Sequence, residues 1–343
     1  MSPGPPETGT PQTASPASAW RVLRWAVLLI VLALVGWRAR SLWIAGQASG
    51  EEVSIHFGWL GAAAAIYLAG WLPSAWFWRC LLRDAGHQVG WLTILRAYYC
   101  GHLGKYVPGK ATVLVIRSAL LRSANVPTST AAWTATWESL LVMGTGGLLG
   151  LGLAPQLLAS PAIGDLPGPL GLAARHPFLL SAAVVVAVLA GFPWLTRLVT
   201  KATRWMLGPT AGDVSVSTRQ VLIAMTAQAV GWLGHGLSLW WTLKGIGATP
   251  LGDSTPEILA GLTAAVGLAT ALGFVAIFAP GGVGIREGLL IEALSFSGLP
   301  LQQAVVVSIL LRGVWLVAEI TAAAVLYYGH RPATLPVPLE SDG

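Results

Sequence analysis

Charged side chains are scarce in this sequence, and their scarcity excludes most soluble folds. Only 10% of the 343 residues are charged, whereas soluble domains carry about 25%. Hydrophobic residues make up 55% of the chain, and the mean hydropathy is +0.68. Because a soluble core cannot enclose that much apolar surface, the composition predicts an all-α, polytopic membrane protein.

Motifs for catalysis and metal binding are missing as well. The chain has no Gly-x-Ser-x-Gly, His-Glu-x-x-His, P-loop or dinucleotide-binding pattern. Its two cysteines, Cys80 and Cys100, lack metal-ligand spacing and offer no disulfide framework. The net charge of +6 comes mostly from loop Lys and Arg without interleaved aromatics, which indicates membrane orientation rather than nucleic-acid binding. We therefore predict no catalytic set, metal, cofactor or nucleic-acid partner.

The hydrophobic pattern divides the chain into two tails and one membrane domain, 20–328. Residues 1–19 are rich in Pro, Ser, Thr and Gly and are expected to be disordered, while 329–343 form a polar tail. The basic stretch 79–127 indicates the cytoplasmic side of a multi-pass protein, which we expect in the cell membrane. The expected full spans are 20–45, 57–78, 128–153, 177–195, 220–243, 258–279 and 301–328.

A break rich in proline and glycine, 279–288, interrupts the downstream spans. Pro280 has no backbone N–H, and three of the next four residues are glycines, so a continuous helix should end here. Arg286 and Glu287 follow directly, and charges at membrane depth are costly in lipid. A broken helix with charges inside an apolar region is typical of a transport-type binding site.

A second break lies upstream, at Pro108-Gly109. It separates two apolar segments, 91–104 and 111–121, which are shorter than the about 20 residues that a span needs. We expect a re-entrant hairpin or a pair of interfacial helices. If 280–299 instead crosses the membrane completely, the protein has eight spans rather than seven.

The two breaks share a spacing. Pro108 is followed by Pro127 after 19 residues, and Pro280 by Pro300 after 20, with a charge inside the next apolar run each time. We interpret this pattern as a diverged internal repeat, with halves at about 55–153 and 220–328. Each half would then contribute one broken or re-entrant helix.

The charges in these runs predict a binding site for an anionic lipid. A guanidinium grips a phosphate with two parallel hydrogen bonds, so we expect Arg286 to meet the headgroup. Glu138 and Arg312 should pair with each other, or with Arg286 and Glu287, and a purely structural salt bridge remains an alternative. Glu319, two turns after Arg312 on the same face, should screen Arg312 or lie near the membrane edge.

Three upstream bases, Lys105, Lys110 and Arg117, have two interpretations. They form a basic funnel for anionic lipids, or they are ordinary positive-inside charge. The expected substrate-binding set is Arg286, Glu287, Arg312, Glu138, Arg117, Lys110, Lys105, Pro280, Gly281, Gly282, Gly284, Pro108 and Gly109.

These residues carry a resemblance to a known family. The stretch Gly104-Lys105-Tyr106-Val107-Pro108-Gly109-Lys110 resembles the first half of the lysylphosphatidylglycerol synthase transmembrane-region family, and 279–288 with Leu311-Arg312 resembles its second half. The resemblance covers about 55–328. It implies a helical, flippase-like domain that moves an anionic phospholipid or a polyprenyl-linked substrate between leaflets.

Two departures from the family limit what carries over. The family's cytoplasmic aminoacyl-transferase domain has no counterpart here, so lysyl-phosphatidylglycerol is not implied as the substrate. The first motif reads Pro-Gly-Lys-Ala-Thr at 108–112 where many relatives carry Pro-Gly-x-Gly-Glu, so headgroup specificity does not transfer. The function we expect is lipid translocation. The alternatives are a membrane-embedded enzyme or accessory subunit of a lipid-modification or polyprenyl-glycan pathway, with a separate lipid-modifying enzyme as partner.

Overall fold

The computed structural model describes residues 55–107, 111–157, 217–248, 255–275, 282 and 284–329, with isolated positions elsewhere. In this part of the chain all regular secondary structure is helical, which confirms the predicted all-α class. The elements are α2 (Phe57–Gly70), α3 (Leu72–Asp84), α4 (Trp91–His102), η1 (Leu103–Tyr106), α5 (Ala111–Leu121), η2 (Arg122–Ala124), α6 (Thr128–Leu157), α10 (Thr218–Gly245), α11 (Thr255–Val275), α12 (Ile285–Phe296) and α13 (Leu301–Gly329).

Among the described residues, four helical stretches are long and apolar enough to cross a membrane. They are Phe57–Asp84, which comprises α2 and α3, then α6, α11 and α13. α10 has 28 residues and is about 42 Å long, but its polar residues keep it outside that set. The expected spans 20–45 and 177–195 and both tails lie outside the continuous described segments.

The first described stretch differs from the expected span 57–78. The helix extends to Asp84 and is interrupted at Trp71, which separates α2 from α3. Pro73 lies in the first turn of α3, where backbone N–H groups have no partner within the helix, so its missing N–H costs nothing there. The same missing N–H prevents α2 from continuing through this position. The interruption places the Trp71 side chain in the protein interior, where it is 4% exposed.

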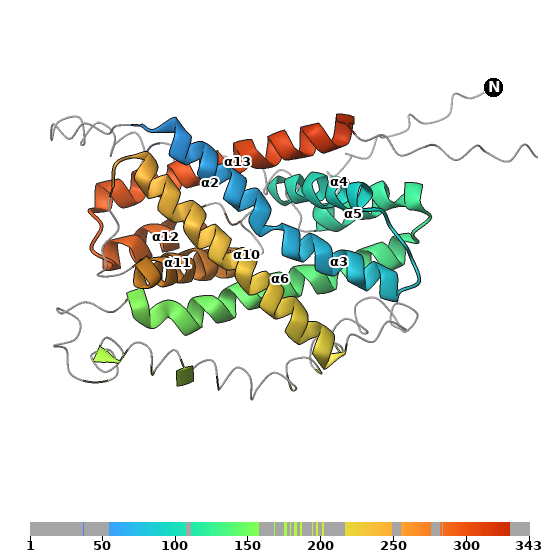
Figure 1. Ribbon diagram of the computed structural model, residues 1–343, viewed down its shortest axis with the longest axis horizontal. Coiled ribbons are helices and arrows are strands. Elements are labelled where there is room, and N and C mark those ends of the chain that lie inside the picture. The colour runs from blue at the N-terminus through green and yellow to red at the C-terminus, as the bar shows by residue number, and fades with distance from the viewer. Residues whose placement is uncertain are drawn as a thin grey trace, which may run out of the picture.

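Short helices form where the sequence predicts segments too short to span. α4 and α5 have 12 and 11 residues and pack against each other, and α12 has 12 residues and packs against α11 and α13. Figure 1 places α4 and α5 near one end of the long helices and α11 and α12 near the other.

The downstream break depends on glycine. α12 begins at Ile285, directly after Gly284, whose φ is +86°; the φ of Gly282 is +68°. Other residues rarely adopt this left-handed region, so these two glycines allow the turn into α12. A Cβ on Gly282 would also lie 3.0 Å from the Cα of Gly273 in α11, so the chain passes this helix at close range.

α6 and α11 approach each other through small residues. A Cβ on Gly267 would lie 2.6 Å from the carbonyl oxygen of Gly146, so the two backbones are almost in contact. Such close approach is characteristic of helix pairs in membranes, where packing rather than a hydrophobic difference holds helices together.

We expect Gly267→Ala to destabilise the protein by about 1–3 kcal/mol, because the added methyl group forces α6 and α11 apart. Gly144→Ala is the matched control, since a Cβ on Gly144 of α6 meets nothing within 4 Å. The control should be neutral or slightly stabilising, as alanine favours helix by up to about 1 kcal/mol over glycine. Thermal unfolding in detergent micelles compares the two variants, and equal midpoints would contradict the close-packing argument.

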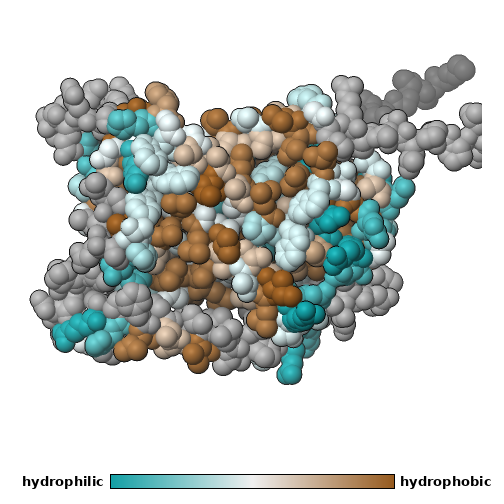
Figure 2. Space-filling view, viewed as in Figure 1, coloured by the Kyte–Doolittle hydropathy of each residue, from teal (hydrophilic) through white to brown (hydrophobic). Residues whose placement is uncertain are grey.

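The outer surface of the bundle is apolar around its middle. Figure 2 shows hydrophobic residues over the centre of this face and hydrophilic residues gathered toward its two ends. Large hydrophobic side chains are exposed on several helices, among them Val115, Val230, Val317 and Val325. A soluble protein rarely exposes such a band, whereas the hydrocarbon of a bilayer covers it.

Candidate functional site

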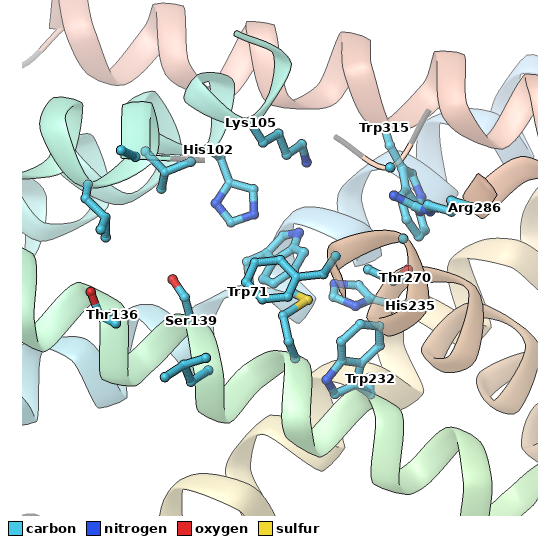
Figure 3. Close-up of a pocket in the computed structure, with 18 residues that line it drawn as sticks. Trp71, His102, Lys105, Thr136, Ser139, Trp232, His235, Thr270, Arg286 and Trp315 are labelled. Carbon is cyan, nitrogen blue, oxygen red and sulfur yellow. The ribbon is translucent and has the colours of Figure 1, made fainter. Parts of the chain in front are cut away.

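A cavity of about 440 Å³ lies between the helices of both halves of the described chain. Figure 3 shows side chains from α4, α6, α10, α12 and α13 converging on it. Its lining residues are Trp71, His102, Lys105, Ala111, Val113, Leu114, Thr136, Ser139, Leu140, Met143, Trp232, His235, Thr270, Gly273, Phe274, Gly282, Arg286 and Trp315.

The charge of this lining has a single sign. Among the described residues that form it, Lys105 and Arg286 are the charged members, and none is acidic. The other members are mainly aromatic or aliphatic. A mostly apolar cavity with a few convergent polar groups is the usual form of a small-ligand site.

Arg286 is the second residue of α12 and is 8% exposed. Its guanidinium carbon lies 4.2 Å from the centroid of the Trp315 ring, and it makes no hydrogen bond or ion pair within the described part of the chain. The indole N–H of Trp315 donates to the hydroxyl of Ser238 at 2.9 Å, which fixes the ring under the arginine. Arg286 is therefore held by an aromatic face, with its N–H groups available for an anion.

Glu287, the next residue, contacts the α12 backbone and Arg312. One carboxylate oxygen accepts a hydrogen bond from the backbone N–H of Gly284 at 2.7 Å, and the other lies 3.7 Å from Nε of Arg312. The Ser308 hydroxyl donates to the backbone carbonyl of Glu287. Glu287 thus caps α12, ties it to α13, and balances Arg312 rather than Arg286. The expected pairing of Arg312 with this acid is present.

Lys105, the other charged residue of the lining, shares a carboxylate with two tyrosines. Its Nζ lies 2.5 Å from Glu319 of α13, the Tyr106 hydroxyl donates to the same carboxylate at 2.9 Å, and the Tyr67 hydroxyl donates to it as well. Glu319 is fully buried, so these donors compensate its charge. The carboxylate therefore anchors η1 to α13, and its direct partners are Lys105, Tyr106 and Tyr67.

Glu138 and Arg117 form a separate, buried ion pair. The carboxylate lies 2.6 Å from an Arg117 nitrogen and accepts from the Tyr98 hydroxyl at 2.9 Å. Both residues are 1% exposed, and neither lines the cavity. The expected pairing of Glu138 with Arg312 is therefore not what the structure has. α5 and α6 are neighbours in sequence and pack directly, so Arg117 reaches this carboxylate within the first half.

Of the other expected site residues, some lie at the cavity or at α12 and the rest lie outside the described chain. Gly282 lines the cavity and Gly284 precedes α12, whereas Pro108, Gly109, Lys110, Pro280 and Gly281 lie outside the described residues. No group of three potential metal-ligating side chains occurs in the described segments.

Sequence reasoning missed the aromatic and histidine part of the lining. Trp71 lies between α2 and α3, while His102, His235 and Trp315 lie in α4, α10 and α13, and nothing in their spacing relates them. The two histidines within apolar segments are the sequence signal that could have indicated this part of the lining, because a buried imidazole needs a polar partner. Which residues share a cavity follows only from the packing of the helices.

Comparison with known families agrees with the resemblance of the motifs. Residues 21–322 match the family described as lysylphosphatidylglycerol synthase TM region. A search of curated proteins returns no match. The match covers most of the 343 residues, including both breaks and every described helix up to the last turns of α13. The chain is therefore a multi-pass integral membrane protein that belongs to the lysylphosphatidylglycerol synthase TM region family.

Proposed function

We propose that this protein moves an anionic lipid between the leaflets of a membrane, with the lipid headgroup bound in the central cavity. The observation that carries the proposal is Arg286, a buried arginine in the cavity lining without an acidic partner among the described residues. A buried, uncompensated charge costs several kcal/mol, and an anionic ligand would offset that cost.

The rim of the cavity supports a lipid rather than a water-soluble anion. Leu140 of α6 and Phe274 of α11 line the cavity and are 38% and 36% exposed, so the apolar part of the lining is accessible rather than sealed in protein. Ala111 at the start of α5 is likewise exposed. An apolar rim of this kind allows a headgroup to occupy the cavity while its acyl chains remain in the surrounding bilayer.

The packing of the helices supports a two-half transport architecture. α4 contacts α13 as α11 contacts α6, and α2 contacts α13 as α10 contacts α6. Exchanging α4–α5–α6 with α11–α12–α13 therefore reproduces the neighbour relations, as expected for the internal repeat at about 55–153 and 220–328. With α4 and α5 at one end and α11 and α12 at the other, two re-entrant elements would approach the cavity from opposite sides (Figure 1).

Reconstitution into liposomes tests the proposal. Purified protein should accelerate leaflet exchange of tail-labelled phosphatidylglycerol, or of a polyprenyl-phosphate sugar, well above protein-free liposomes. The lipids are extracted afterwards and analysed chemically. A chemically altered lipid would replace translocation with the enzyme alternative, and the absence of both exchange and alteration would contradict the proposal.

A further inference from the structure

Arg96 of α4 lies against α13 and is not among the described residues that line the central cavity. It is partly buried, and its guanidinium carbon lies 4.8 Å from the centroid of the Tyr327 ring, near the C-terminal end of α13. One turn further along α4, the thiol of Cys100 donates to the backbone carbonyl of Ala323 at 3.6 Å. Arg96 therefore occupies the seam between two packed helices, and Figure 1 places the end of α13 next to α4.

The charge of Arg96 has no acidic partner among the described residues. Each of the ion pairs in that part of the chain involves a different base. The Nε of Arg96 is also buried without a hydrogen bond. Arg117 has an unmet Nε as well, but Glu138 neutralises its charge. The Tyr327 ring stabilises the cation of Arg96 without supplying the acceptors that its N–H groups require.

The side chains around Arg96 form a surface suited to the edge of a bilayer. Leu92, one turn before Arg96 on α4, is 54% exposed, and Tyr327 is 46% exposed. Ile320, two turns before Tyr327 on the same face of α13, is 50% exposed. Tyrosine at the end of a membrane-spanning helix is typical of the interface, where its ring meets hydrocarbon and its hydroxyl meets headgroups. Arg96 thus lies where an apolar helix face meets the headgroup level.

The electrostatics of this end of the protein favours an anionic partner. Arg96 belongs to the stretch 79–127, in which bases far outnumber acids and which indicates the cytoplasmic side. Basic groups at that surface attract the anionic phospholipids of the cytoplasmic leaflet. A guanidinium offers a phosphate two parallel N–H donors together with its charge, which are the two things that Arg96 has unmatched.

We propose that Arg96, Tyr327 and Leu92 form a second lipid site, at the membrane interface between α4 and α13. Its occupant is a phospholipid of net negative charge, with its phosphate on Arg96 and its acyl chains along the apolar face that includes Ile320. The site is separate from the transport cavity and does not require that the protein moves lipids. Because α4 and α13 both contribute to the cavity wall, the bound lipid stabilises the helices around the cavity.

Lipid counting by native mass spectrometry tests the site. The full-length protein in detergent is titrated with phosphatidylglycerol or with phosphatidylcholine, which carries a phosphate but no net charge. Wild-type protein should retain phosphatidylglycerol in preference. Arg96→Gln should retain one phosphatidylglycerol fewer, with binding at that position weakened about tenfold by the loss of charged hydrogen bonds. An unfolding midpoint equal to that of the wild type in lipid-free micelles shows that the variant is folded.

Two further variants and a soluble phosphate sharpen the assignment. Arg83→Gln is the matched control, because Arg83 lies in the same basic stretch but is exposed and already contacts Asp84, so lipid retention should not change. Tyr327→Leu keeps an apolar side chain and removes the ring from Arg96, so it should weaken binding by a smaller factor. sn-Glycerol 3-phosphate should not displace the lipid, and displacement would assign the site to a soluble phosphate and overturn the lipid proposal.

Arg286→Gln separates this site from the transport cavity. Independent sites predict that Arg286→Gln and Arg96→Gln each lose one phosphatidylglycerol and that the double variant loses both. Equal retention by the wild type and Arg96→Gln, or a double variant that loses no more lipid than Arg286→Gln, would overturn the second site even if lipid exchange proceeds in liposomes. Loss of one lipid in Arg96→Gln, without lipid exchange by the wild type, would support the second site and overturn translocation.

Discussion

Arg286→Gln should slow lipid exchange by roughly 10- to 100-fold, which is the loss expected when hydrogen bonds to a charged group disappear. Glutamine keeps polar character and much of the length, but it removes the positive charge and the paired N–H groups that hold a phosphate. Lys105 cannot replace this charge, because Glu319 already pairs with it at 2.5 Å. The rate of leaflet exchange of phosphatidylglycerol in liposomes measures the effect.

Two further variants define the cause of that loss. Arg286→Lys keeps the charge but loses the planar fork, so we expect an intermediate rate. Arg122→Gln removes a charge from an exposed position in η2, outside the cavity lining, and should exchange lipid at the wild-type rate. Wild-type exchange by Arg286→Gln, with normal unfolding behaviour, would remove this arginine from the transport path.

The second large effect concerns stability. Arg117→Met should lower the unfolding free energy by about 3–5 kcal/mol, because it leaves the carboxylate of Glu138 buried without its cation. The guanidinium also packs against Tyr98, with its central carbon 4.2 Å from the ring centroid, and that contact is lost too. Thermal or denaturant unfolding in micelles should show a large decrease in midpoint.

The controls for this variant use an exposed pair and a double substitution. Arg83→Met breaks the contact of Arg83 with Asp84, where the arginine side chain is 63% exposed, so it should cost no more than about 1 kcal/mol. Arg117→Met combined with Glu138→Met should recover part of the loss, because no unpaired charge remains. A folded Arg117→Met protein that no longer exchanges lipid would instead place this pair on the transport path.

Similar charges on the short helices α5 and α12 have different surroundings. Arg117 on α5 meets Glu138 on the following long helix, and the pair is buried in protein. Glu287 on α12 meets Arg312 on the following long helix, and the adjacent Arg286 lines the cavity. Arg117 is thus neutralised by a carboxylate, whereas Arg286 contacts an aromatic ring and the cavity.

Several features were determined by the sequence alone. Low charge and high apolar content require a membrane protein, and the apolar runs locate α6, α10, α11 and α13 closely. The starts of α12 and α5 follow from Pro-Gly breaks at 280 and 108, because the missing N–H and the missing Cβ act locally. Composition and backbone chemistry do not depend on which helix packs beside which.

The partners of the charges were decided by the tertiary structure. The sequence predicted that Glu138 pairs with Arg312 or joins Arg286 and Glu287, since any of these choices satisfies the need for compensation in an apolar region. Direct packing of α5 on α6 selects Arg117. The same packing gives Lys105 to Glu319 and leaves Arg286 for the cavity. Electrostatics demands that buried charges be compensated, but only the arrangement of helices brings a particular pair within reach.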